Sequence, residues 1–201
     1  MASSDAIAYF GDTLVKLLQD GLKDLLAPAE IVLSTLSDFK NSTTSEPTVT
    51  VFLYDVGTSG ETRTVSTSAI DGATPSDPLD LHFLITPWAP VTRDVYVLTG
   101  AIIALLYAHP IFTPEELLGP QGTWAPGDTV EISLESLSIE NQCCIWKAIG
   151  VPYRLSLAYL ARGIEIGPTP ALTAKRTSEL GLVTFTTHPS APSHESDPER
   201  R

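Results

Sequence analysis

The chain has 201 residues, of which 43% are hydrophobic and 18% charged, so it carries enough apolar material for a folded core. Its formal net charge is −12, from 24 acidic and 12 basic residues. Residues 168–201 contain four of each kind, which leaves all of the net charge in residues 1–167. Such a body repels nucleic acid and anionic lipid, because binding either requires clustered lysine and arginine. The charge therefore argues against both partners.

Hydrophobic periodicity predicts both helices and strands along residues 1–167. In chain order we expect a helix at 4–26, strands at 30–36, 48–56 and within 78–90, a helix at 92–109 and, after a turn-rich connection at 113–128, a strand at 129–137, a helix at 138–150 and a strand at 152–167. Residues 57–77 are rich in Gly, Ser and Thr and indicate a loop or a hairpin tip. The predicted fold is α+β, a small, mainly antiparallel sheet with helices covering one of its faces.

Four local signals refine this prediction. Thr92 is placed to cap the helix that follows it. Val130, Ile132 and Leu134 alternate with polar residues, as in a half-exposed strand. In the last strand every second residue from Leu155 to Ala161 is predicted to face inward. After Gly163 the apolar residues fall on even-numbered positions, which indicates a bulge or bend at this glycine. Gly150 is a suitable helix terminator.

The composition changes after Pro168. Residues 168–181 resemble a linker, LVTFTT at 182–187 is a lone strand-forming segment, and the remainder is typical of disordered chain. We therefore expect one domain at 1–167 and an extended arm at 168–201. The segment LVTFTT has three open interpretations: an edge strand of its own sheet, a strand added to a neighbour's sheet, or an inert segment.

The sequence contains no feature of a membrane or secreted protein. The N-terminus lacks the basic region of a secretory signal. The apolar stretch from Val95 to Ala108 is shorter than the roughly 20 residues that span a bilayer, so we interpret it as a core helix. Cys143 and Cys144 are adjacent and suit buried or half-buried positions on a helix better than a disulfide or a zinc site. We expect a cytoplasmic protein.

Standard catalytic and nucleotide-binding motifs are absent from the sequence. It has no Gly-x-x-x-x-Gly-Lys-Ser/Thr loop, no Gly-x-Gly-x-x-Gly and no Gly-x-Ser-x-Gly. The histidines (His82, His109, His188 and His194) share no ligand spacing. We expect no catalytic residue, metal, cofactor or small-molecule substrate.

Acidic pairs and His82 leave one catalytic alternative. Glu115–Glu116 and Glu131–Glu135 are typical of solvated positions on a loop and on a strand face. His82, whose nearest acid in sequence is Asp80, is interpreted as a hydrogen-bonded structural residue. An enzyme that uses Asp80 with His82, or Glu131 with Glu135, is the alternative.

Two Trp-Ala-Pro triplets supply candidate interface residues. Pro87 should end its strand and hold Trp88 in an ordered turn, since proline lacks an N–H. Trp88 and Trp124 are each either a lid on the core or an interface anchor, because tryptophan is enriched at interface hot spots. Arg93 is either a contact at the rim of that interface or a charge at a helix start. The remaining interface candidates are Leu182, Val183, Thr184, Phe185 and Thr186.

Four segments together resemble a known bacterial family. They are IAYFGDTLVKLLQDGL, PTVTVFLYDV, LDLHFLITPWAP and SLESLSIENQCCIWKAIGVPYRLSLAYLARGIEI. In this order they are similar to the cap, or tail-terminator, proteins of extracellular contractile injection systems such as the Photorhabdus virulence cassettes and the Serratia antifeeding prophage. The resemblance covers about residues 5–167.

The resemblance implies a structural role within a phage-tail-like particle. It implies a tail-terminator-like fold and a hexameric ring that closes the inner tube and contractile sheath at the pole opposite the baseplate. The implied partners are further copies of the chain, the inner tube protein and the sheath protein. Two alternatives remain: an adaptor that binds one partner through LVTFTT without forming rings, and the enzyme described above.

Overall fold

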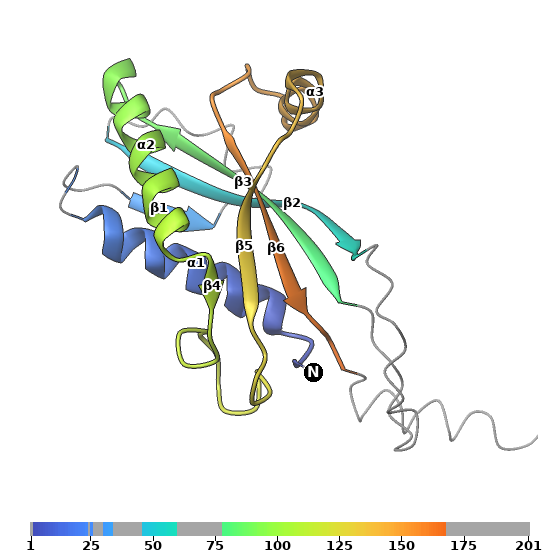
Figure 1. Cartoon of the computed structure of the whole chain (residues 1–201). Coiled ribbons are helices and arrows are strands. Elements are labelled where there is room, and N and C mark those ends of the chain that lie inside the picture. The colour runs from blue at the N-terminus through green and yellow to red at the C-terminus, as the bar shows by residue number, and fades with distance from the viewer. Residues whose placement is uncertain (1, 24, 26–29, 34–45, 60–77, 168–201) are drawn as a thin grey trace, which may run out of the picture. The chain divides into compact units, whose positions relative to one another are not determined.

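The computed structural model describes residues 2–23, 25, 30–33, 46–59 and 78–167 (Figure 1). Residues 1–167 form one compact unit by their contacts. In chain order its elements are α1 (Ala6–Leu22), β1 (Glu30–Leu33), β2 (Thr48–Thr58), β3 (Leu79–Trp88), α2 (Thr92–Ala108), β4 (Ile111–Phe112), β5 (Val130–Glu135), α3 (Ile139–Ile149) and β6 (Leu157–Ile164). The loop predicted at 60–77 and the arm predicted at 168–201 lie outside the described residues.

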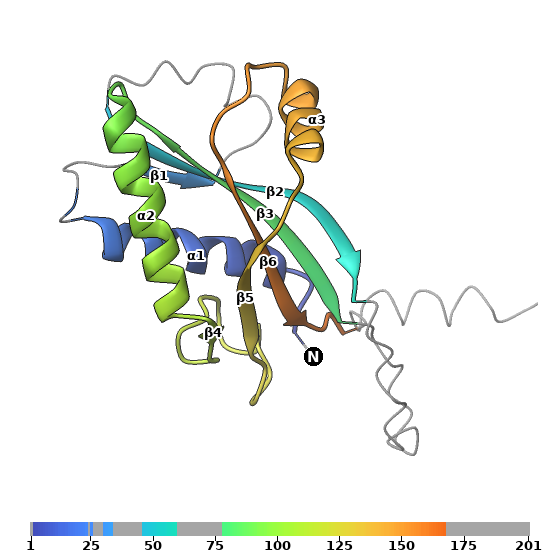
Figure 2. The ribbon, with the colours of Figure 1, turned by 45° about the horizontal axis from the view of Figure 1, so that its top comes forward.

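The strands form one sheet with the order β1-β2-β3-β6-β5-β4 (Figure 2). The pairing of β1 with β2 is parallel, and the other pairings within the described sheet are antiparallel. The predicted α+β class and the mainly antiparallel sheet are therefore confirmed. The short strand β4 was not predicted, since it consists of only two residues, separated from α2 by His109 and Pro110.

The larger core lies between one face of the sheet and the helices α1 and α2. Phe10, Leu14, Leu18 and Leu22 form the buried stripe of α1, as the predicted helical periodicity requires. The Phe10 ring packs against Phe83 of β3 and Phe112 of β4, with ring centroids 5.8 Å and 5.5 Å apart. These ring contacts join α1 to β3 and β4, while Leu98, Ile102 and Leu106 are the buried residues of α2 in the same core.

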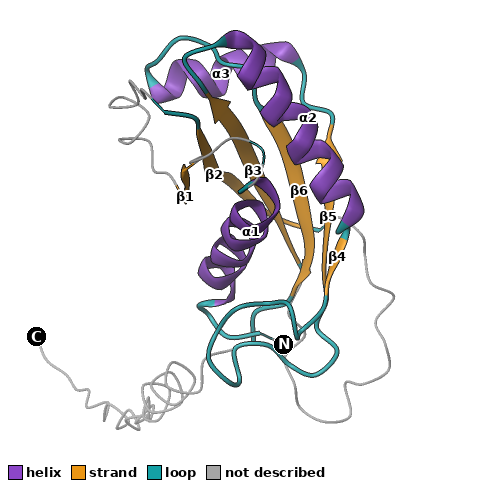
Figure 3. Cartoon of the chain, turned by 90° about the vertical axis from the view of Figure 1, so that its left-hand side faces the viewer, coloured by secondary structure: helices purple, strands orange, loops and turns teal. Residues whose placement is uncertain are grey.

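A second, smaller core lies on the opposite face, beneath α3 (Figure 3). It consists of Leu84, Trp88, Trp146 and Ile149. Side chains alternate along β3, so Phe83 enters the larger core while Leu84 enters the smaller one. The prediction that the helices cover a single face was therefore wrong, because both residue sets of β3 are partly apolar and each needs a cover.

The strand β3 continues through Pro87 to Trp88, contrary to the prediction that proline would end it. Pro87 and Trp88 still pair with β2, opposite Val49 and Thr48. The neighbour on the other side, β6, pairs with β3 only as far as Ile85. Beyond Ile85, β3 has a described neighbour on one side only. Pro87, which has no N–H to donate, is therefore tolerated within the strand.

Two irregularities bend the sheet. Gly163 is skipped in the pairing of β6 with β3, where Leu79 faces Ile164 and Asp80 faces Arg162. Its φ of 99° is in the left-handed region, which favours glycine. The bulge predicted at this residue is therefore confirmed. A second shift lies in β2, between Leu53 and Asp55.

Several predicted side-chain positions were wrong. Leu134 is 53% exposed, whereas Val130 and Ile132, earlier in the same strand, are buried in the larger core. Leu155 is 38% exposed and precedes β6, which begins at Leu157. Thr92 is the first residue of α2 and makes no capping hydrogen bond; Val91 precedes it.

The helix α3 has its ends as expected and its cysteines in unexpected positions. Ser138 caps its start by accepting a hydrogen bond from the Asn141 N–H, and Gly150 ends it with a φ of 82°. Cys143 and Cys144 are free and exposed, contrary to the prediction. The reason is that Trp146 and Ile149 form the buried side of this short helix, which turns both cysteines outward.

Candidate functional site

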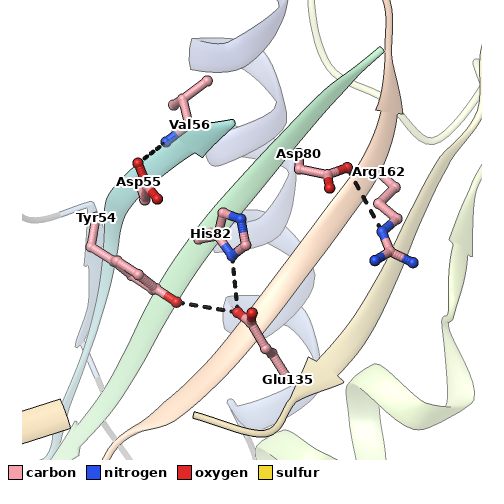
Figure 4. A network of polar contacts seen from close by, with 7 residues as sticks. All are labelled: Tyr54, Asp55, Val56, Asp80, His82, Glu135 and Arg162. Carbon is pink, nitrogen blue, oxygen red and sulfur yellow. Dashed lines mark hydrogen bonds and ion pairs between the residues drawn. The ribbon is translucent and has the colours of Figure 1, made fainter. Parts of the chain in front are cut away.

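A polar cluster joins β2, β3 and β5 on the sheet face that carries α3 (Figure 4). His82 Nδ1 lies 2.9 Å from Glu135 Oε2, and the Tyr54 hydroxyl donates to the same oxygen at 3.2 Å. The Tyr54 and His82 rings also contact one another, with centroids 5.8 Å apart. Since β6 lies between β3 and β5, these side chains bridge across a whole strand.

The environment of Tyr54 keeps its phenol protonated. Burial, and then the negative charge of Glu135, raise the pKa of Tyr54 well above its usual range. The phenol is therefore a permanent donor to the carboxylate at physiological pH. The pKa of Tyr159, in the larger core, is raised by burial to about 12.

We expect Tyr54 to make folding stability fall at alkaline pH. A pKa raised by folding gives stability that is complete below the unfolded value of about 10 and is lost as the pH rises through the folded value. Between about pH 8 and about pH 11 the wild type should lose more unfolding free energy than Tyr54→Phe, which cannot ionise. Denaturant unfolding at a series of pH values measures this. Glu135→Gln, which keeps the phenol but removes the charge, should give an intermediate slope, and parallel profiles for all three proteins would contradict the assignment.

Asp80 does not serve as the acid for His82, as the sequence had suggested. Its partner is Arg162 on β6, whose Nε lies 3.7 Å from Asp80 Oδ1, too far for a hydrogen bond. That oxygen is buried and makes no hydrogen bond in the described part of the chain. Arg162 is half exposed, so the pair contributes a weak ionic contact.

The predicted acidic pairs do not form paired carboxylates for acid–base chemistry. Glu131 is exposed and lies opposite Arg162, whereas Glu135 is held by His82 and Tyr54. Glu116 accepts hydrogen bonds from the N–H and the hydroxyl of Thr113, both at 2.9 Å, and these bonds lower the pKa of Glu116. Its carboxylate thus serves to close a turn.

A cavity of about 340 Å³ lies beside the polar cluster, between β5, β6 and the start of α3. Leu134, Glu135, Gln142 and Leu157 are among its lining residues, but His82 and Tyr54 are not. The imidazole, the phenol and the carboxylate are partly buried and satisfy one another on the sheet face that carries α3. This arrangement is suited to tying strands together, since none of the three groups is directed with the others into a common cavity.

We expect the contact between His82 and Glu135 to stabilise the fold modestly. Their side chains are 20% and 27% exposed, and a hydrogen bond of this kind contributes about 0.5–1.5 kcal/mol. A double-mutant cycle of His82→Ala and Glu135→Ala should give a coupling free energy in that range. The matched cycle of His82→Ala with Glu131→Ala, on the same strand face, should be additive. Equal coupling in the two cycles would show that no specific contact exists.

The candidate interface residues lie in different environments. Trp88 is only 6% exposed: its Nε1 donates to Thr50 Oγ1 at 3.0 Å and its ring packs edge-on against Trp146. This position fits the core interpretation, and it leaves little of the indole available to a partner. Trp124 is half-buried and donates to the Leu118 carbonyl at 2.7 Å. Arg93 is exposed at the start of α2.

The other candidates give no binding site within the described residues. Residues 182–186 lie outside them, as do His188 and His194. His109 Nδ1 lies 3.0 Å from the Leu105 carbonyl at the end of α2. Among the described positions, no group of His, Cys, Asp and Glu side chains is arranged to hold a metal ion. No described helix is long and apolar enough to cross a membrane.

Sequence reasoning missed the contact between His82 and Glu135. Glu135 is 53 positions from His82 and lies on a strand that is not adjacent to it. The available signal was the alternation of β5, which places Glu135 on the sheet face opposite the larger core. That signal identifies a partner only when the strand order is known.

The chain thus forms a bent, mainly antiparallel sheet with helices on both of its faces. The sequence matches the family described as the Pvc16 N-terminal domain over residues 11–179, and the chain therefore belongs to that family. No curated protein matches it in sequence.

The solved structures with a similar fold include two tube-terminating proteins. The first is the sheath/tube terminator of PVC, an extracellular contractile injection system, in its extended state, with a TM-score of 0.55 and 17% identity over 95% of this chain and 64% of that one. The second is the tube-terminating cap of the anti-feeding prophage, with a TM-score of 0.51 and 17% identity over 92% of this chain and 62% of that one. The chain thus spans less than two thirds of either relative.

Proposed function

We propose that this chain is a structural terminator that caps the inner tube and the contractile sheath of a phage-tail-like injection particle. The observation that carries the proposal is the similarity of nearly the whole chain to two terminating proteins of such particles, together with its membership of the Pvc16 N-terminal domain family. At 17% identity the likeness itself concerns the fold, so the role is an inference from fold and family together.

The polar cluster supports a structural role over a catalytic one. His82, Tyr54 and Glu135 bond to one another, and their effect is to bridge three strands. A catalytic carboxylate or imidazole needs a substrate position within hydrogen-bond reach of both groups. The neighbouring cavity is lined by Glu135 alone of the three, so we assign the cluster to the rigidity of the sheet.

The proposal includes an assembled state. We infer that copies of the chain form a ring, which we expect to be hexameric, and that the ring contacts the tube protein and the sheath protein. The protein would be made in the cytoplasm and built into the particle there. Attachment to the sheath by strand addition of residues 182–187 stays a prediction.

The experiment is deletion of this chain from cells that produce the particle, followed by electron microscopy of purified particles. A terminator determines where tube and sheath growth end, so its loss should broaden the distribution of particle lengths and leave the ends open. Restoring the wild-type chain should restore a uniform length. Particles of normal length with normal ends in the deletion strain would overturn the proposal.

A further inference from the structure

The helix α2 is apolar on two opposite sides, and the described residues cover only one of them. Leu98, Ile102 and Leu106 are buried in the larger core. On the opposite side, Tyr96 is 63% exposed and Tyr107 is 86% exposed. A helix that is apolar all round is normally buried all round, so the outer side of α2 indicates a contact with another molecule.

The outer side forms a continuous line along the helix. Its members follow one another at steps of four, three and four residues: Tyr96, Gly100, Ile103 and Tyr107. This spacing places them on one face, which we call the outer stripe. Arg93, which is exposed, lies one turn before Tyr96 on the same line. Residues 95–108 contain no charged side chain.

Gly100 is an independent sign of a close neighbour. It lies in the middle of α2, where glycine is a poorer helix former than alanine. A Cβ added there would meet no atom within 4 Å, and the backbone does not have a positive φ. The described residues therefore give no reason for a glycine here. A backbone that must approach the helix closely at this point would give one.

Charge indicates which kind of partner fits the stripe. The chain has a net charge of −12. A basic partner would be attracted to the carboxylates elsewhere on this surface and not to an uncharged stripe. A second acidic copy can approach only where carboxylates are few, and the outer stripe is such a place. Arg93 at one end would meet a neighbour of net negative charge, which adds complementarity.

We propose that the outer stripe of α2 is the surface through which one copy of this chain contacts the next. This inference rests on the proposed function, since it names the surface that would join the copies of a capping ring. The exposed tyrosines act as aromatic anchors and Gly100 provides the point of closest approach.

The test uses the full-length chain with Glu placed at three exposed helical positions: Gly100→Glu and Ile103→Glu on the stripe, and the control Ala8→Glu on the exposed side of α1. Sedimentation or light scattering over a concentration series measures self-association. We expect the wild type to associate, the stripe variants to raise the dissociation constant by at least about tenfold, and the control to leave it unchanged. Gly100→Glu should melt as a monomer at no lower temperature than the wild type, because Glu is a better helix former than Gly.

Salt provides a second readout. Raising the ionic strength should strengthen association of the wild type, because it screens repulsion between acidic copies and leaves an apolar contact intact. A wild type that stays monomeric at every concentration and ionic strength, stripe variants that associate as well as the wild type, or association that salt weakens would each overturn the inference. Such a failure differs from failure of the proposed function, which is judged independently by particle length in the deletion strain.

Discussion

Replacing Trp146 by alanine should lower the free energy of unfolding by about 3–5 kcal/mol, the range found for large aromatic side chains removed from cores. Trp146 is 1% exposed and is one of the two tryptophans of the smaller core. It packs edge-on against Trp88, with ring centroids 6.0 Å apart. Because this core attaches α3 to the sheet, loss of the indole leaves the helix with Ile149 as its main buried contact.

Chemical denaturation followed by circular dichroism measures this effect. Lys147→Ala is the matched control, since its side chain is exposed on the same helix and should change stability little. A loss of less than about 1 kcal/mol in Trp146→Ala would show that α3 does not depend on the smaller core.

Replacing Gly163 by alanine should lower the free energy of unfolding by roughly 2–4 kcal/mol. Two causes combine at this bulge. The φ of 99° is unfavourable for a residue with a Cβ, and that Cβ would lie 2.5 Å from the carbonyl oxygen of Thr129. Either the strand β6 or the start of β5 must shift, and both flank the larger core.

Gly127→Ala separates the two causes. Gly127 has a φ of 92°, but a Cβ there would meet no atom within 4 Å. We therefore expect Gly127→Ala to lower the free energy of unfolding by about 1–2 kcal/mol, the contribution of the unfavourable φ alone. Equal losses for the two variants would contradict the steric contribution at Gly163.

Local signals predicted the parts of the fold that depend on neighbouring residues. The apolar period of α1, the β-branched residues of β2 and the change of parity at Gly163 each act over a few residues. The structure confirms the helix, the strand and the bulge at those positions. Gly150 likewise ends α3 in the left-handed conformation that its lack of a side chain allows.

Features that depend on strand order were not predictable from local patterns. Pro87 was expected to end β3, and it does not, because β6 stops pairing with β3 before reaching it. Glu135 was taken for a solvated acid, although it binds His82 across an intervening strand. The outward side of α2 was included in a core helix, because the sequence shows that a helix is apolar but not which of its sides the chain covers.

The most direct test of the central claim is to locate the chain on the assembled particle. A small tag on the full-length protein, labelled and imaged by electron microscopy, would show its position on particles with an identifiable baseplate. A terminator should appear at a single pole, opposite the baseplate, and in the same place on extended and contracted particles. Label distributed along the sheath, located at the baseplate or absent from purified particles would contradict the account.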